Sequence, residues 1–137
     1  MSDGERVAIP QATVDQEFER AEQMLADAMK AHEVGISKAT IVNRLYYACF
    51  HAAQGALYAR GFVPKSHGRV QTLLGRELIQ RDDVPRQFGR FFNDIETYRR
   101  RVDYGSGGVE RDVDELVEET SAFCEELRRA AGIDPNE

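Results

Sequence analysis

The sequence of 137 residues contains few cysteines, no long apolar run and no excess of basic charge. Its two cysteines, Cys49 and Cys124, show no paired spacing. This usage disfavours a disulfide framework and is typical of buried thiols in a reducing compartment. No stretch approaches the ~20 apolar residues of a membrane-spanning helix. The net charge of −6 argues against a surface that coats nucleic acid, although a local basic site stays compatible with it.

Recognisable metal and cofactor motifs are also scarce. The histidines at positions 32, 51 and 67 are not spaced as His-x-x-x-His or Glu-x-x-His pairs, so no metal site is predicted. The glycine cluster at residues 104–108 follows a helix-like segment rather than a strand, so neither a phosphate loop nor a dinucleotide fingerprint is present, and no cofactor is expected. The first ten residues lack the pattern of a signal sequence. We therefore expect a cytoplasmic protein without membrane attachment.

Apolar residues recur with the period of a helix along most of the chain, and no segment alternates long enough to predict a strand. Residues 36–60 predict one long helix, because they contain no proline and a single glycine before Gly61 ends them. Further helices are predicted over residues 13–33, 66–78, 85–102 and 109–131. The fold class is therefore all-α, an up-and-down bundle of about five helices at residues 13–132, with a flexible N-terminal tail at 1–12 and a C-terminal tail at 133–137.

The long central helix has two apolar rows and a third row of mixed character. The third row consists of Arg44, Tyr47, His51, Gln54 and Tyr58. Its members share one face of the helix and combine aromatic bodies with hydrogen-bonding tips. We expect any functional surface of this helix to lie there, whereas the two apolar rows have to be covered from several sides.

Two helix starts carry residues that suit N-terminal caps. Thr13, with Gln16 three residues later, resembles a capping box. Ser66 is the predicted cap of the third helix, and Lys65 and His67 flank it. A helix N-terminus with these neighbours favours an anion such as phosphate, because free backbone N–H groups and the helix dipole point at it. Ordinary capping is the alternative interpretation.

Arg99 is the arginine that needs an explanation. Helical spacing places it within the apolar face of residues 85–102, whereas Arg100 and Arg101 point away from that face. A guanidinium that faces a core must be paired or must line a polar cleft, and Asp103 stands four residues later to pair with it. A structural ion pair at the helix end and a functional arginine are both consistent with this position.

Three ordered motifs carry a family resemblance. They read N-R-L-Y-Y-A-x-F-H-A-A at residues 43–53, G-x-x-P-K-S-H at residues 61–67 and R-x-x-x-D-Y at residues 99–104. Together they resemble the HEPN superfamily, in particular its small proteins whose third motif reads Arg, three residues, Asp-Tyr. The resemblance covers about residues 13–130. It implies a helical bundle that forms a homodimer, often encoded beside a minimal nucleotidyltransferase in a toxin–antitoxin module.

The sequence departs from the active ribonucleases of that superfamily, which place a histidine four to six residues after the arginine. No histidine follows Arg99 in this chain. The resemblance therefore implies a non-catalytic or weakly active protein that binds a partner nucleotidyltransferase, a nucleotide or an RNA end. The expected ligand-binding residues are Tyr47, His51, Lys65, Ser66, His67, Arg99, Asp103 and Tyr104. The alternative is a metal-independent RNA endonuclease that uses Arg99 with His51 or His67 as the proton shuttle.

Overall fold

The structure is a computed structural model that describes residues 6–105 and 107–133. Its elements are α1 (Gln11–Glu33), α2 (Lys38–Ala59), α3 (His67–Leu74), the π-helical turn η1 (Gly75–Ile79), α4 (Arg86–Tyr104) and α5 (Val113–Ala130). The prediction of an all-α bundle with five helices is confirmed, and no strand occurs within the described ranges. The parts of the predicted tails at residues 1–5 and 134–137 lie outside the described residues.

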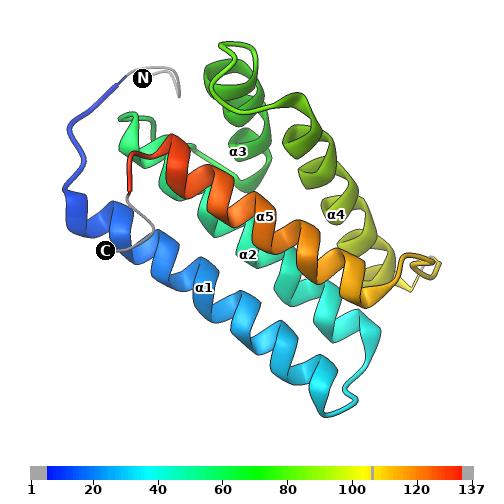
Figure 1. The fold of residues 1–137 in the computed structure, drawn as a ribbon. Coiled ribbons are helices and arrows are strands. Elements are labelled where there is room, and N and C mark those ends of the chain that lie inside the picture. The colour runs from blue at the N-terminus through cyan, green and yellow to red at the C-terminus, as the bar shows by residue number, and fades with distance from the viewer. Residues whose placement is uncertain (1–5, 106, 134–137) are drawn as a thin grey trace.

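Helix α2 occupies the centre of the bundle. Figure 1 shows α5 running along α2, with α1 on one side and α4 on the other. The start of α3 lies against the middle of α2, where the His67 ring contacts those of Tyr47 and Phe50. The apolar rows of α2 are almost fully buried. They include Ile41, Leu45, Ala48, Cys49, Ala52 and Ala56 in one row and Tyr46, Phe50, Ala53 and Leu57 in the other. Both predicted rows therefore belong to the core, to which α1, α4 and α5 contribute their own apolar faces.

The helix ends show where local sequence is informative. The Ser66 side chain accepts a hydrogen bond from the Arg69 N–H, so the predicted cap of α3 is confirmed. The predicted capping box at Thr13 is wrong, because α1 begins at Gln11 and the Pro10 carbonyl accepts from the Thr13 N–H instead. Helix α5 begins at Val113 rather than at residue 109, since the Asp112 side chain caps it.

The segment before α1 lies against the end of α2. The Val7 N–H donates to the Gly61 carbonyl at 2.8 Å, and the Arg6 guanidinium stacks 5.3 Å from the centre of the Phe62 ring. Gly61 has φ +86°, a conformation that side chains rarely adopt, and a Cβ there would lie 2.7 Å from the Val7 carbonyl oxygen. This turn therefore fixes residues 6–10, which the sequence alone placed in a tail.

The packing of α1 on α2 depends on a close approach at Gly55. A Cβ at this position would lie 2.7 Å from Cε2 of Phe18, and neighbouring ring atoms would also be crowded. Phe18 is itself 2% exposed, so its ring has little room to move. Gly68, in the first turn of α3, has no such neighbour within 4 Å.

Gly55→Ala should destabilise the protein although alanine is the better helix former. The clash with Phe18 costs about 1–3 kcal/mol, while the gain in helix propensity is at most about 1 kcal/mol. Gly68→Ala receives the same gain without the clash, so urea unfolding should separate the two variants by about 2 kcal/mol. Equal midpoints for the two variants would contradict the close packing of α1 on α2.

Candidate functional site

One side of α2 is incompletely covered within the described structure. The five residues of its mixed row, Arg44, Tyr47, His51, Gln54 and Tyr58, are all half-buried. They lie between side chains of α1 on one side and the start of α3 on the other. The row that the sequence singled out thus forms a polar and aromatic surface at the edge of the core.

A buried carboxylate of α1 organises the first part of this surface. The His51 Nδ1 lies 2.6 Å from Oε2 of Glu17, and the Gln54 side-chain amide donates to the other carboxylate oxygen at 3.1 Å. Arg20 lies 3.3 Å from the same oxygen as Gln54. Glu17 is 4% exposed, so three donors surround a carboxylate that water hardly reaches.

The charge state of Glu17 fixes the orientation of His51. Burial alone would raise the pKa of the Glu17 carboxyl, but hydrogen bonds from His51 and Gln54 and the charges of His51 and Arg20 outweigh it and lower the pKa. Glu17 is therefore a carboxylate that only accepts, so the bonded Nδ1 of His51 carries the proton. The other ring nitrogen, Nε2, is left to face a ligand as acceptor or, when protonated, as donor.

Two histidines meet at the ring of Phe50. The His67 ring centre lies 4.3 Å from that of Phe50 and 6.5 Å from that of Tyr47, and the His51 ring lies 5.2 Å from Phe50 in an edge arrangement. Phe50 itself is buried. The structure thus brings Tyr47, His51 and His67 into one aromatic cluster, although they come from α2 and from the start of α3.

Arg99 lies beside this cluster on α4. Its guanidinium stacks 4.6 Å from the centre of the Tyr46 ring, and Nη1 forms an ion pair with Oδ2 of Asp103 at 2.9 Å. The Arg99 side chain is 20% exposed, and its buried Nε has no hydrogen-bond partner among the described residues. The Tyr46 ring centre lies 5.0 Å from that of Tyr47. A continuous set of ring contacts therefore links Arg99 to both histidines.

The ring beneath Arg99 keeps its proton. Burial, followed by the charge of Glu96, raises the pKa of Tyr46 to about 12, although the charge of Arg99 acts in the opposite direction. A neutral phenol presents the electron-rich face that a cation prefers. Tyr46 therefore holds the guanidinium in position as an aromatic surface and does not act as an anion.

The remaining expected site residues are placed less centrally. Tyr104 is the last residue of α4 and is 78% exposed, one position after the paired Asp103. Lys65 and Ser66 are exposed at the start of α3, where the Ser66 oxygen is already engaged in the cap. Glu17 was missed by the sequence analysis. The sequence does contain a sign of Glu17, because this charged residue stands in the apolar row of α1, three residues after Val14 and four before Ala21.

Comparison with known proteins identifies the family. Residues 14–130 match the family model of the HEPN domain. The chain belongs to the HEPN domain family. This confirms the family predicted from the three motifs, whereas the subgroup with the Arg-x-x-x-Asp-Tyr motif stays a prediction.

Two relatives of this HEPN chain are informative. It is 32% identical over 93 residues to a UPF0332 protein of Thermotoga maritima. The matched region covers 67% of this chain and 64% of that protein. It is also 26% identical over 90 residues to a protein of Methanocaldococcus jannaschii whose name marks it as a candidate toxin. That matched region covers 65% of this chain and 67% of that protein. The matched region thus spans somewhat less than two thirds of the Thermotoga protein's length.

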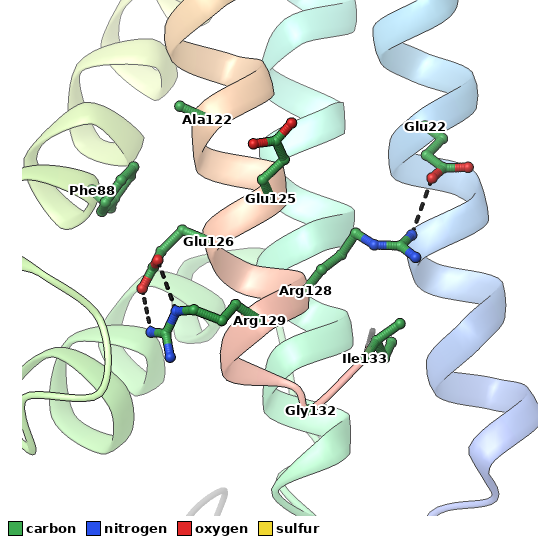
Figure 2. A pocket seen from close by; sticks show the side chains of 9 residues that line it. All are labelled: Glu22, Phe88, Ala122, Glu125, Glu126, Arg128, Arg129, Gly132 and Ile133. Atoms are coloured by element: carbon green, nitrogen blue, oxygen red, sulfur yellow. Dashed lines mark hydrogen bonds and ion pairs between the residues drawn. The ribbon is translucent and has the colours of Figure 1, made fainter. Parts of the chain in front are cut away.

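The lining of one large cavity of this HEPN domain includes neither the histidines nor Arg99. The cavity has a volume of about 740 Å³ and is lined by Phe88 of α4, by the last turns of α5 and by Glu22 of α1. Figure 2 shows that both arginines of this cavity pair with carboxylates, Arg128 with Glu22 and Arg129 with Glu126. Because both arginines of this cavity are paired, whereas Nε of Arg99 has no hydrogen-bond partner among the described residues, we place the candidate site at Arg99 and the histidines rather than here.

The described residues of the HEPN domain offer no group of three His, Cys, Asp or Glu side chains that could hold a metal ion. None of the described helices is long and apolar enough to cross a membrane. Within the described part of the chain, the chemistry at hand is therefore that of Arg99, the two histidines, the tyrosines and the carboxylates of Glu17 and Asp103.

The low pKa of Glu17 makes a prediction for acid stability. A carboxyl whose pKa is lowered on folding stabilises the native state above its unfolded pKa, near 4.5, and loses that contribution as pH falls through the folded value. Wild type should therefore be more stable than Glu17→Gln at pH 7, and the difference should shrink below about pH 4.5.

Urea unfolding of both proteins between pH 3 and pH 7 measures this difference. Glu19→Gln, an exposed change on the same helix, serves as the control and should follow the wild-type curve. A gap between wild type and Glu17→Gln that stays constant over the whole pH range would show that Glu17 has no lowered pKa.

Proposed function

We propose that this HEPN domain binds a phosphate-bearing ligand, a nucleotide or an RNA end, on the surface formed by Arg99, Tyr47, His51 and His67. We further propose that it works with a nucleotidyltransferase partner as one half of a toxin–antitoxin module and has little or no catalytic activity of its own. The observation that carries the proposal is the position of Arg99, stacked on Tyr46 and continuous with two histidines at one edge of the core.

The chemistry of this surface suits a nucleotide. An arginine held by an aromatic ring and a carboxylate presents its remaining donors in a fixed direction, which favours binding of a phosphate oxygen. The half-buried Tyr47 ring and the imidazole of His67 offer flat partners for a base. Asp103, Tyr104, Lys65 and Ser66 border this surface in the proposal and would contact the outer parts of the ligand.

The relatives support the biological setting at a coarse level. The Methanocaldococcus protein carries a name that marks it as a candidate toxin, and a HEPN domain together with such a relative favours a toxin-type module. A nucleotidyltransferase partner is our inference from the same family context. The name of the Thermotoga protein says nothing about activity, so it supports the family alone.

Weak catalysis follows from how the possible proton carriers are engaged. The group that stands after Arg99 is the carboxylate of Asp103, which the arginine itself occupies in an ion pair. RNA cleavage without metal needs a base for the 2′-OH and an acid for the leaving oxygen. His51 and His67 lie on α2 and α3 rather than on the helix that carries Arg99.

Binding should be measured by titrating AMP, ATP and a short single-stranded RNA into the protein. Arg99→Ala should weaken binding at least tenfold, because it removes a charge-assisted donor pair worth about 1.5–3 kcal/mol. Arg44→Ala is the matched control and should bind as wild type does, because Arg44 lies on α2, outside the proposed surface, and its side chain contacts Met24 of α1. Equal affinities for wild type and Arg99→Ala would remove the site.

The alternative, an RNA endonuclease, has one specific observation in its favour. The Glu17 carboxylate orients His51 with Nε2 free, which is the arrangement that a general base needs. The titration above is therefore paired with an RNA cleavage assay without metal. Efficient cleavage by wild type that both Arg99→Ala and His51→Ala abolish would replace the binding role with the nuclease.

We also propose a homodimer that covers the open side of α2, with Tyr47, His51 and part of α4 at the interface. The half-buried aromatic row is the kind of surface that a second copy can bury. Light scattering at tens of micromolar should show a dimer, and Tyr47→Arg should shift it toward monomer. Met29→Arg, on the exposed outer side of α1, should leave the dimer intact. A wild-type monomer at this concentration would contradict the proposal.

A further inference from the structure

The outer side of α4 carries arginines without acidic partners. Within the described part of the chain, Arg86, Arg90 and Arg101 form no ion pair or hydrogen bond, and all three are exposed. Helical spacing places them on one side of α4, at intervals of four and eleven residues. We call these three residues the arginine stripe. In a chain with net charge −6, in which most other arginines pair with carboxylates, this stripe stands out.

One member of the stripe, Arg86, lies where a helix disfavours positive charge. Arg86 is the first residue of α4 and Arg90 follows one turn later, and the first turn of this helix contains no acidic residue. The amino-terminal end of a helix carries a partial positive charge that acts within the first turn, so the cation of Arg86 is unfavourable there. A bound anion would offset this unfavourable arrangement.

A groove lies beside the stripe, between α4 and the turn from α3 into η1. It has a volume of about 210 Å³, with Arg86 and Arg90 among its lining residues and Leu74 and Phe92 as its apolar floor. The Gly89 backbone allows α4 to approach η1 closely, because a Cβ there would lie 2.4 Å from Cδ1 of Ile79. The groove is therefore built by close packing of these two elements.

The groove also offers polar groups at its rim. The Gln71 side-chain amide donates to Oδ1 of Asn93 at 2.5 Å, which leaves the Asn93 amide nitrogen as a donor and the Gln71 oxygen as an acceptor. Gly75 lines the groove without a side chain, and a Cβ there would meet nothing within 4 Å. An apolar floor with a donor and an acceptor at its edge matches the flat face and polar edge of a nucleobase.

We propose that this groove and the arginine stripe bind single-stranded nucleic acid. The groove is smaller than the roughly 300–1,000 Å³ of pockets that enclose a whole small molecule, so it accepts one unit of a longer chain. Along the helix axis, Arg101 lies about 22 Å from Arg86. A single nucleotide cannot span this distance, whereas a chain of phosphates can. An acidic peptide would satisfy the arginines and leave the apolar floor and amide edge without a matching group.

This surface is separate from the one around Arg99. Arg99 faces Tyr46 in the interior of the bundle, whereas the stripe faces away from it on the same helix. The inference therefore stands independently of the proposed function, and variants at the two surfaces give separate results.

The test uses a labelled 12-nucleotide single-stranded RNA and a DNA of the same sequence, with binding measured by fluorescence anisotropy at several salt concentrations. Arg86→Gln with Arg90→Gln should weaken binding tenfold or more. It should also reduce the slope of log affinity against log salt by about 1.4, since each lost phosphate contact on a single strand removes about 0.7. The RNA and DNA arms then show which of the two polymers the surface prefers.

Two further variants distinguish specific binding in the groove from non-specific attraction by positive charge. Arg6→Gln with Lys30→Gln removes the same charge from residues outside α4 and should change affinity less than twofold. Gly75→Leu places a side chain in the groove and keeps both arginines, so it should weaken binding several-fold with the salt slope unchanged. Circular dichroism and the urea midpoint confirm that each variant is folded.

Five outcomes would overturn the inference, and the first four concern this surface alone. These four are no binding of either oligonucleotide by wild type at 50 mM salt, an equal loss for the two double variants, unchanged binding by Gly75→Leu, and tighter binding of poly-glutamate than of the oligonucleotides. Loss of oligonucleotide binding in Arg99→Ala with full binding in Arg86→Gln/Arg90→Gln would also overturn it, while supporting the surface of the proposed function.

Discussion

Helix α2 is apolar over most of its girth, and this one property constrains the positions of the other helices. Ala48, Cys49 and Leu57 are fully buried and point in different directions around the axis, so no single partner helix can cover them all. Helices α1, α4 and α5 pack against α2 for this reason (Figure 1), and the start of α3 lies against Tyr47 and Phe50. The small residues of α2 let these neighbours come close, as the contact of Gly55 with Phe18 shows.

The polar groups at the margin of this core follow a common rule. Glu17 of α1 and Arg99 of α4 each occupy a position that the helical period assigns to the apolar face. A charge at such a position is stable only if it is paired, and each of the two has found partners. Both lie where α2 is least covered. Because the other helices cover α2 incompletely there, charged and hydrogen-bonding side chains can lie at that edge of the core.

Sequence reasoning succeeded where structure depends on one helix at a time. The five helices, the two buried rows of α2, the Ser66 cap and the pair of Arg99 with Asp103 all follow from spacing within a helix. The bond between Glu17 and His51 joins residues 34 apart, and it depends on how α1 is rotated against α2, which periodicity does not contain. The stacking of Arg99 on Tyr46 was missed for the same reason, since it joins α4 to α2.

The two candidate ligand surfaces use arginine in physically different ways. Arg99 is held by a ring and a carboxylate, so little side-chain entropy is lost when it binds, and its donors already have a direction. Arg86 and Arg90 are exposed and unpaired in the described structure, so they retain rotamer freedom and contribute mainly through charge. An arginine whose guanidinium is fixed by neighbouring side chains favours discrimination between ligands. Arginines without such contacts favour salt-dependent affinity for any phosphate chain. In the scheme proposed above, the outer side of α4 would therefore retain a nucleic acid, and the surface at Arg99 would select the group that is recognised.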